Sequence, residues 1–198
     1  MAQNLKLIDN LGIVIFPSPR SRAYLQSFEK MGLSPSCCLL VESPSSFDLE
    51  INNTKIDYFD LERTEEESLT SMGVNYKIVH AKSINDKKIR TILRKQNEEY
   101  FIYTGGGIVS SEVLNEKHFI HIHSGDLPKY RGSTTFYYSI LNDNNIVCSV
   151  ILMDPKIDEG PILHKRKFSI TGGYNFDHLY EPYLRSVTLS EFIYDFIE

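Results

Sequence analysis

Two histidines separated by one residue, together with a distant aspartate, have the types and spacing of an acid–base site. His121 and His123 close the apolar run 119–123, which indicates a buried strand. Side chains two positions apart in a strand point to the same face, so the two imidazoles can lie side by side. Asp158 lies in a tight acidic turn, 157–161. A carboxylate beside an imidazole can hold its tautomer and stabilise the imidazolium, so these residues predict proton transfer.

The same residues allow two other interpretations. A His-x-His pair is also the first-strand ligand pair of (β/α)₈ metal hydrolases, but that barrel takes about 250 residues. This chain has 198 residues, and its other histidines are not clustered at ligand spacing. Aspartate is also common in turns, which accounts for Asp158 without any chemistry. We expect no metal, and a metal site is the second interpretation.

Two further loops follow predicted strands and are candidate ligand sites. Ser18–Arg22 opens a helix, where free backbone N–H groups together with Arg20 and Arg22 favour an anion. The alternative there is a serine cap with two surface arginines. Gly105, Gly106 and Gly107 let the backbone approach a flat ligand closely. Their spacing matches neither G-x-G-x-x-G nor a P-loop, so a dinucleotide site is poorly supported.

The elements that must position these residues alternate between strand and helix in the first half of the chain. We predict strands at 11–16, 37–41, 76–79, 100–103, 119–123, 146–153 and 161–168, with a polar loop at 43–63. Helices are expected before Gly32 and at 89–93, 136–141 and 176–198. Strand–helix–strand order indicates an α/β fold: a Rossmann-like, mostly parallel sheet with helices on both faces. We expect a single domain, 1–198.

Composition narrows the class of protein. With 41% apolar and 24% charged residues, the chain is typical of a globular protein rather than a disordered one. It contains no apolar run of membrane-spanning length, its N-terminus lacks the order of a signal peptide, and its three cysteines make no disulfide framework. A net charge of −5 argues against nonspecific nucleic-acid binding. We therefore expect a cytoplasmic protein without a membrane or nucleic-acid partner.

Two linked motifs resemble those of the folate-dependent formyltransferases. That family carries Asn-x-His-Pro-Ser-Leu-Leu-Pro-x-Tyr-Arg-Gly and, later, Leu-Asp-x-Gly-Pro-Ile. The corresponding segments here are His-Ile-His-Ser-Gly-Asp-Leu-Pro-Lys-Tyr-Arg-Gly at 121–132 and Ile-Asp-Glu-Gly-Pro-Ile at 157–162. Their order and separation agree with the family, and the resemblance covers residues 100–165. Before residue 100 it is topological only.

The resemblance implies transfer of a formyl group from N10-formyltetrahydrofolate to a primary amine. It places the family's catalytic histidine and aspartate at His123 and Asp158, and it puts His121 where the family has an asparagine. That asparagine donates a hydrogen bond to the formyl oxygen, and we expect a ring N–H of His121 to replace it. The folate is expected between the loop of Gly105, Gly106, Gly107, Ile108 and Val109 and the turn that contains Asp154 and Ile157.

An amino sugar, free or nucleotide-linked, is the expected small-molecule acceptor. Arg20 and Arg22 would lie near its phosphate, and Tyr137 would line its side of the site. We expect no RNA-contacting second domain of the methionyl-tRNA formyltransferase type, because the chain ends too soon to contain one. The sequence leaves open whether the protein forms a homodimer. The alternatives are a hydrolase that passes the formyl group to water, and a noncatalytic domain that binds folate or sugar.

Overall fold

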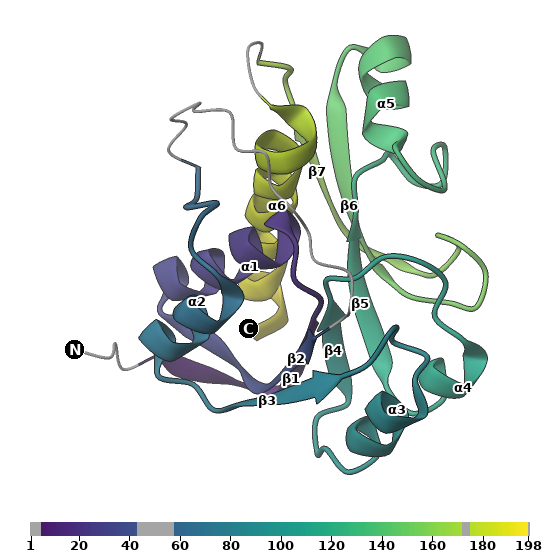
Figure 1. Cartoon of the computed structure of the whole chain (residues 1–198). Helices are drawn as coiled ribbons and strands as arrows, with labels where there is room; N and C mark the ends of the chain where they lie inside the picture. Colours follow the sequence, from purple (N-terminus) through teal and green to yellow (C-terminus); the bar gives the residue numbers. More distant parts are fainter. Residues whose placement is uncertain (1–4, 43–57, 172–174, 198) are drawn as a thin grey trace.

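A seven-stranded β-sheet runs through the part of the chain that the structure describes (Figure 1). The structure is a computed structural model, and it describes residues 5–42, 58–171 and 175–197. The strand order is β3-β2-β1-β4-β5-β6-β7. Their bounds are β1 Lys6–Ile15, β2 Leu33–Glu42, β3 Tyr76–His80, β4 Tyr100–Tyr103, β5 His118–His123, β6 Ile146–Leu152 and β7 Ile162–Phe168.

Four of the strand pairings are parallel and two are antiparallel. β1 pairs in parallel with both β2 and β4, β2 pairs with β3, and β4 pairs with β5. β6 runs antiparallel to β5, with His121 opposite Ile151 and His123 opposite Ser149, and β7 runs antiparallel to β6. The strand order reverses between β1 and β4, where open α/β sheets bind ligands beyond the carboxyl ends of the strands.

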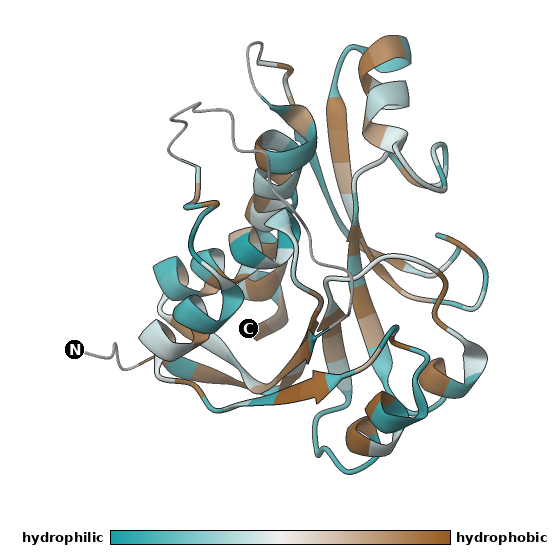
Figure 2. Ribbon diagram, viewed as in Figure 1, coloured by the Kyte–Doolittle hydropathy of each residue, from teal (hydrophilic) through white to brown (hydrophobic). Residues whose placement is uncertain are grey.

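Helices cover both faces of the sheet. Figure 2 shows much of the strands in brown, while the helices are mixtures of teal, white and brown. One core contains Phe28, Leu69 and Leu189 from three helices on one face, and a second core contains Ile89 and Val113 from the other face. The helices are α1 Pro19–Met31, α2 Glu65–Met72, α3 Lys87–Leu93, α4 Ser111–Leu114, α5 Thr135–Asp143 and α6 Glu181–Ile197, with the π-helical turn η1 Phe176–Tyr180 before α6.

Local sequence explains where α1 begins and ends. The Ser18 side chain accepts from the Ser21 N–H, and the Ser21 hydroxyl accepts from the Ser18 N–H at 2.8 Å, which is a capping box. Pro19 suits the first helical position because it has no N–H to leave unpaired. Gly32 ends the helix with φ of 70°. The N-terminus of α1 is therefore fixed beside the carboxyl end of β1.

The predicted fold class is confirmed: the sheet is Rossmann-like and mostly parallel, with helices on both faces. Each predicted strand is present. β1 begins five residues earlier than predicted, because residues 6–10 also belong to the strand. Helices α2 and α4 were not predicted. Of the predicted loop 43–63, residues 43–57 lie outside the described residues. No helix in the described part of the chain is long and apolar enough to cross a membrane.

Candidate active site

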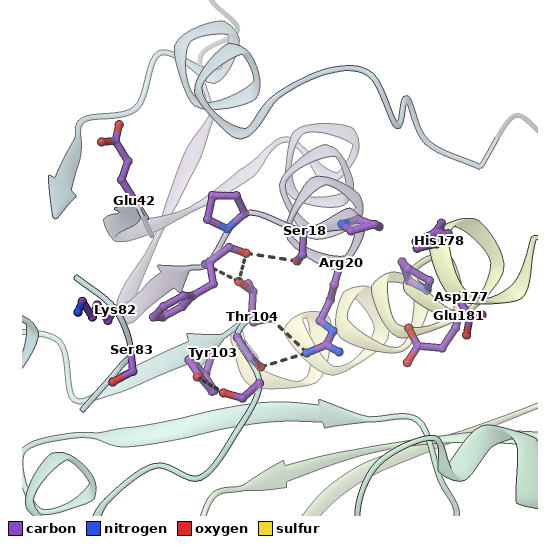
Figure 3. Close-up of a pocket in the computed structure, with 16 residues that line it drawn as sticks. Ser18, Arg20, Glu42, Lys82, Ser83, Tyr103, Thr104, Asp177, His178 and Glu181 are labelled. Carbon is purple, nitrogen blue, oxygen red and sulfur yellow. Dashed lines mark hydrogen bonds between the residues drawn. The ribbon is translucent and has the colours of Figure 1, made fainter. Parts of the chain in front are cut away.

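A large cavity opens at the point where the strand order reverses. We name it the switch-point cavity; its volume is about 730 Å³. Figure 3 shows Arg20 and Glu181 at one end and Glu42 with Lys82 at the other. Thr104 connects the loop after β4 to the loop after β1, because its Oγ1 accepts from the Phe16 N–H at 2.8 Å. The reversal of strand order thus produces the cleft expected of this topology.

Arg20 reaches from the N-terminus of α1 into this cavity. Its Nη1 donates to the carbonyl oxygens of Thr104 at 3.2 Å and Gly105 at 3.1 Å. Its Nε is buried and has no hydrogen-bond partner among the described residues. A buried donor without a partner costs free energy. The guanidinium as a whole lines the cavity and carries a positive charge. Arg20 is therefore suited to hold an anionic or strongly polar ligand group.

A second cavity, which we name the histidine cavity, adjoins the first. Its volume is about 540 Å³, and its lining contains His121, His123 and Asp158. Arg20, Tyr103 and Glu181 are among the residues that line both cavities. The structure thus brings the three predicted acid–base residues together in the wall of the histidine cavity, which adjoins the switch-point cavity.

His123 is buried, with only 4% of its surface exposed. Its Nε2 lies 2.8 Å from the carbonyl oxygen of Tyr130, and because a carbonyl can only accept, Nε2 carries the proton. Nδ1 consequently faces Asp158, with 3.5 Å between Nδ1 and Oδ2. Burial lowers the pKa of His123, while the Asp158 carboxylate opposes that shift. Both ring nitrogens thus face acceptors, and the Asp158 carboxylate is placed to stabilise a proton on Nδ1.

Asp158 is held in place by the backbone around it. Its φ is 53°, a left-handed value that aspartate tolerates better than most residues. Its Oδ2 accepts from the Gly132 N–H at 2.8 Å. The turn also passes so close to β6 that a Cβ at position 160 would lie 1.7 Å from the Leu152 carbonyl oxygen, which requires Gly160. Strained backbone of this kind is concentrated at functional sites.

His121 has a different environment from His123. Its Nδ1 lies 3.3 Å from the Tyr103 carbonyl oxygen, so Nδ1 carries the proton of the neutral ring. Burial, and then the guanidinium groups of Arg20 and Arg185, hold the pKa of His121 well below its usual value. The expected N–H donation to the formyl oxygen does not fit this arrangement, because the one N–H of the neutral ring points to Tyr103.

A shallow recess continues from the histidine cavity between two loops. It holds about 50 Å³, and we name it the loop recess. Ile108 and Ile157 are 61% and 55% exposed and stand on opposite loops, so apolar surface faces the opening from both. All of the residues predicted to contact a folate line the histidine cavity or the recess: Gly105, Gly106, Gly107, Ile108, Val109, Asp154 and Ile157.

Two of the predicted acceptor residues are placed differently from the expectation. Arg22 lies outside both large cavities, where its guanidinium donates to the Leu61 carbonyl oxygen and lies 3.5 Å from Glu65. The prediction for Arg22 is therefore wrong, because α1 turns this side chain toward α2 rather than toward the site. Tyr137 is on the rim: its hydroxyl donates to Asp177 at 2.9 Å, and Asp177 lines both cavities.

A buried ion pair at the start of α6 was missed by the sequence analysis. Glu181 and Arg185 are both buried, form an ion pair and line the histidine cavity. Arg185 also donates to the Ile122 carbonyl oxygen and, at 2.8 Å, to Ser124 Oγ. The pair therefore fixes the backbone between the two histidines. The sequence feature that could have revealed this ion pair is two opposite charges four residues apart on the apolar face of a predicted helix.

Gly125 is required by the packing around His123. A Cβ there would lie 2.6 Å from His123 Nε2 and 2.6 Å from Thr135 Oγ1. We expect Gly125→Ala to lower the free energy of unfolding by about 1–3 kcal/mol through overpacking and to displace the ring from Tyr130. Urea denaturation checks the first effect, with Gly106→Ala as control because nothing lies within 4 Å of its Cβ. Equal stability of the two variants would contradict the tight packing.

Comparison with known proteins identifies the family. The formyl transferase family model matches residues 50–186. The chain belongs to the formyl transferase family. Members of this family use N10-formyltetrahydrofolate as the formyl donor. Among curated relatives, methionyl-tRNA formyltransferase of Helicobacter pylori is 32% identical over 96 residues, 48% of this chain and 32% of that protein. The Finegoldia magna enzyme of the same name is 25% identical over 115 residues, 56% of this chain and 37% of that protein.

The chain spans about a third of the length of these curated relatives. Solved structures of similar fold cover nearly all of it. Phosphoribosylglycinamide formyltransferase of Campylobacter jejuni has a TM-score of 0.66 at 16% identity, and the match covers 98% of this chain and 100% of that one. A sugar N-formyltransferase of a Shewanella species has a TM-score of 0.56 at 18% identity, over 98% of this chain and 72% of that one. These likenesses establish the fold.

Metal chemistry was the second interpretation of the two histidines. Among residues 5–42, 58–171 and 175–197, no group of three or more His, Cys, Asp or Glu side chains is placed to hold a metal ion.

Proposed function

We propose that this protein transfers a formyl group from N10-formyltetrahydrofolate to a primary amine on a small molecule, with an amino sugar as the acceptor. The observation that carries the proposal is the pair of His123 and Asp158 in the wall of the histidine cavity, which shares Arg20, Tyr103 and Glu181 with the switch-point cavity. An amine that reaches from the switch-point cavity into the histidine cavity would meet the donor in the cavity that this pair lines. Membership of the formyl transferase family supports the reaction class.

The pair of His123 and Asp158 would hold and return a proton. The neutral ring carries its proton on Nε2, toward Tyr130, so Nδ1 is the atom that accepts another. The carboxylate of Asp158, 3.5 Å away, would stabilise the imidazolium that results. Asp158 also lines the loop recess, so the pair is suited to serve the donor side of the reaction.

The donor would bind in the histidine cavity and the loop recess. The fit rests on the cavity of about 540 Å³, which is an ordinary volume for a ligand of this size. Exposed Ile108 and Ile157 on opposite loops offer apolar contacts to the two faces of a flat ring, and the glycine loop leaves its backbone polar groups accessible. The folate supplies the activated formyl group when bound.

The acceptor would occupy the switch-point cavity. Its volume of about 730 Å³ suits a sugar larger than a monosaccharide, including one that carries a phosphate. Arg20, whose side chain lines the cavity, would hold the anionic group, and Asp177 on the rim would accept from sugar hydroxyls. Tyr137 would contact the acceptor at the same rim, since it donates to Asp177.

Arg20 and Arg22 form a matched pair for testing this assignment. We expect Arg20→Gln to raise the KM of an anionic acceptor about 10- to 100-fold, because a hydrogen bond to a charged group is worth about 1.5–3 kcal/mol. Arg22→Gln removes the same charge from a side chain that faces Glu65, outside the cavities, and should leave the KM unchanged. Steady-state kinetics with a phosphorylated amino sugar measures both. Equal effects of the two substitutions would contradict the proposed acceptor site.

The function itself is tested with an acceptor panel. The protein is incubated with N10-formyltetrahydrofolate and, separately, a nucleotide-linked amino sugar, a free amino sugar, methionyl-tRNA and no acceptor. We expect an N-formyl product with an amino sugar. Formylated methionyl-tRNA alone would overturn the sugar assignment, and formate released equally with and without amines would identify a hydrolase. Calorimetric binding of 5-formyltetrahydrofolate without turnover in any arm would identify a noncatalytic binding domain.

A further inference from the structure

Glu42 is the last residue of β2, and it lines the switch-point cavity at the end opposite Arg20 (Figure 3). β2 lies beside β1 and runs parallel to it, so the carboxyl ends of both strands meet at the same edge of the sheet. In Rossmann-type nucleotide sites, an acidic side chain about 20 residues after the first strand–helix turn accepts from ribose hydroxyls. Glu42 follows the first such turn of this chain, which Ser18 caps, at a similar separation.

The contacts around Glu42 hold its carboxylate in place without using it up. Glu42 and His80 are partners at the paired ends of β2 and β3, and 2.8 Å separates Glu42 Oε2 from His80 Nδ1. The Glu42 carbonyl oxygen accepts from the Ala81 N–H at 3.2 Å, so the next loop is fixed beside it. A carboxylate has two oxygens with about four lone-pair sites, and the Glu42 side chain is 43% exposed. It therefore keeps the capacity to accept from the two hydroxyls of a vicinal diol.

The rest of the cavity wall contains the other groups that a nucleoside needs. Lys82 and Ser83 are exposed in the loop after β3 and line the same end of the cavity (Figure 3). Phe16, the first residue after β1, also lines the cavity, and its ring packs edge-on against Tyr103 with 5.8 Å between centroids. Apolar surface combined with a few polar groups is typical of sites for small organic ligands.

The two ends of the switch-point cavity can serve two parts of one acceptor. Arg20 lines both large cavities, so an acceptor whose amine enters the histidine cavity has its anionic group beside Arg20 and its remainder toward Glu42. The loop after β1 lacks the glycines of a dinucleotide site, and the Arg20 guanidinium supplies positive charge there instead. A diphosphate is an anionic linker of this kind, with a sugar on one side and a nucleoside on the other.

We propose that Glu42 binds the 2′,3′-diol of a ribonucleoside, so that the acceptor is an amino sugar linked to a ribonucleoside diphosphate. The inference deepens the proposed function and rests on it. Glu42 then determines specificity, because a 2′-deoxyribonucleoside has only one of the two hydroxyls that the carboxylate would bind. The cavity of about 730 Å³ is within the range of about 300–1,000 Å³ that small-molecule sites occupy.

Calorimetric titration without folate tests the nucleoside site by itself. The titrants are the diphosphates of adenosine, cytidine, guanosine and uridine, their 2′-deoxy counterparts, and inorganic pyrophosphate. We expect at least one ribonucleoside diphosphate to bind about 10- to 100-fold more tightly than its 2′-deoxy counterpart, because the latter lacks one hydrogen bond to a charged acceptor. Pyrophosphate, which has no ribose, should bind more weakly than that ribonucleotide.

Glu42→Ala is expected to reduce the preference for ribose to less than about threefold, because no charged acceptor remains at this position. Glu42→Gln keeps the size of the side chain and should reduce the preference as well. Glu66→Ala is the matched control: Glu66 is an exposed residue of α2 outside both large cavities, and the preference should persist in this variant. Far-ultraviolet circular dichroism checks that each variant is folded.

Four results would overturn the proposal: equal affinity for ribose and deoxyribose ligands, a preference that Glu42→Ala and Glu42→Gln leave unchanged, pyrophosphate binding as tight as any nucleotide, or no nucleotide binding at millimolar concentration. The KM values of amino sugars linked to ribonucleosides and to deoxyribonucleosides then separate this inference from the proposed function. Formyl transfer with equal KM values would overturn the role of Glu42 alone. The expected binding pattern without transfer to any amine would support the ribose site and overturn the proposed function.

Discussion

Asp158→Asn is expected to reduce formyl transfer about 10²- to 10⁴-fold, the range that proton-transfer groups contribute. Asparagine removes the negative charge that stabilises protonated His123, 3.5 Å away. It keeps an oxygen that can accept from the Gly132 N–H, and it tolerates the φ of 53° about as well as aspartate does. The fold should therefore survive while kcat falls. Single-turnover kinetics with saturating donor measures the chemical step.

Glu159→Gln provides the matched control for this prediction. Glu159 is the next residue in the same turn, and it pairs with Arg131 at 2.7 Å on the exposed side. The Glu159 carboxylate does not contact His123. Neutralising it should therefore change kcat less than about threefold, because an exposed ion pair contributes little free energy. Comparable losses in the two variants would show that the turn, rather than the Asp158 carboxylate, is what matters.

Arg185→Met is expected to lower the free energy of unfolding by about 3–5 kcal/mol. Methionine fills much of the same space but leaves the buried carboxylate of Glu181 without its ion-pair partner. It also removes the donors to the Ile122 carbonyl oxygen and to Ser124. Urea denaturation followed by far-ultraviolet circular dichroism measures the loss.

The double variant Glu181→Gln with Arg185→Met separates charge from packing. If the cost comes from an unpaired buried carboxylate, removing that charge restores a large part of the lost stability. A double variant no more stable than Arg185→Met would assign the loss to the hydrogen bonds of Arg185 instead. A single variant within 1 kcal/mol of the unsubstituted protein would mean that Arg20 already neutralises Glu181.

Much of the site could be predicted because it lies on strongly patterned elements. His121 and His123 sit on a buried strand, where alternation places both rings on one face. Asp158 lies in the turn between β6 and β7, the two strands that continue the sheet beyond β5, and its carboxylate lies 3.5 Å from His123. The resemblance of two motifs provided that long-range link, since spacing along the chain does not by itself bring residue 158 to residue 123.

The remaining features depend on contacts that sequence patterns do not contain. The Arg22 side chain points toward Glu65 because α2, a helix that was not predicted, packs there. The tautomer of His121 depends on one carbonyl oxygen, that of Tyr103 on the neighbouring strand. Glu181 and Arg185 look like an ordinary pair on a helix surface until the packing of α6 buries them. In each case a tertiary contact, rather than local propensity, decides the role of the side chain.

The most direct measurement follows the formyl carbon itself. The protein is mixed with N10-formyltetrahydrofolate labelled with ¹³C in the formyl group and with a nucleotide-linked amino sugar, and ¹³C spectra are recorded through the reaction. The account predicts that the label appears as an N-formyl group on the sugar and that Asp158→Asn nearly abolishes its appearance. Label that stays on the donor, or appears only as formate, would contradict the proposed transfer.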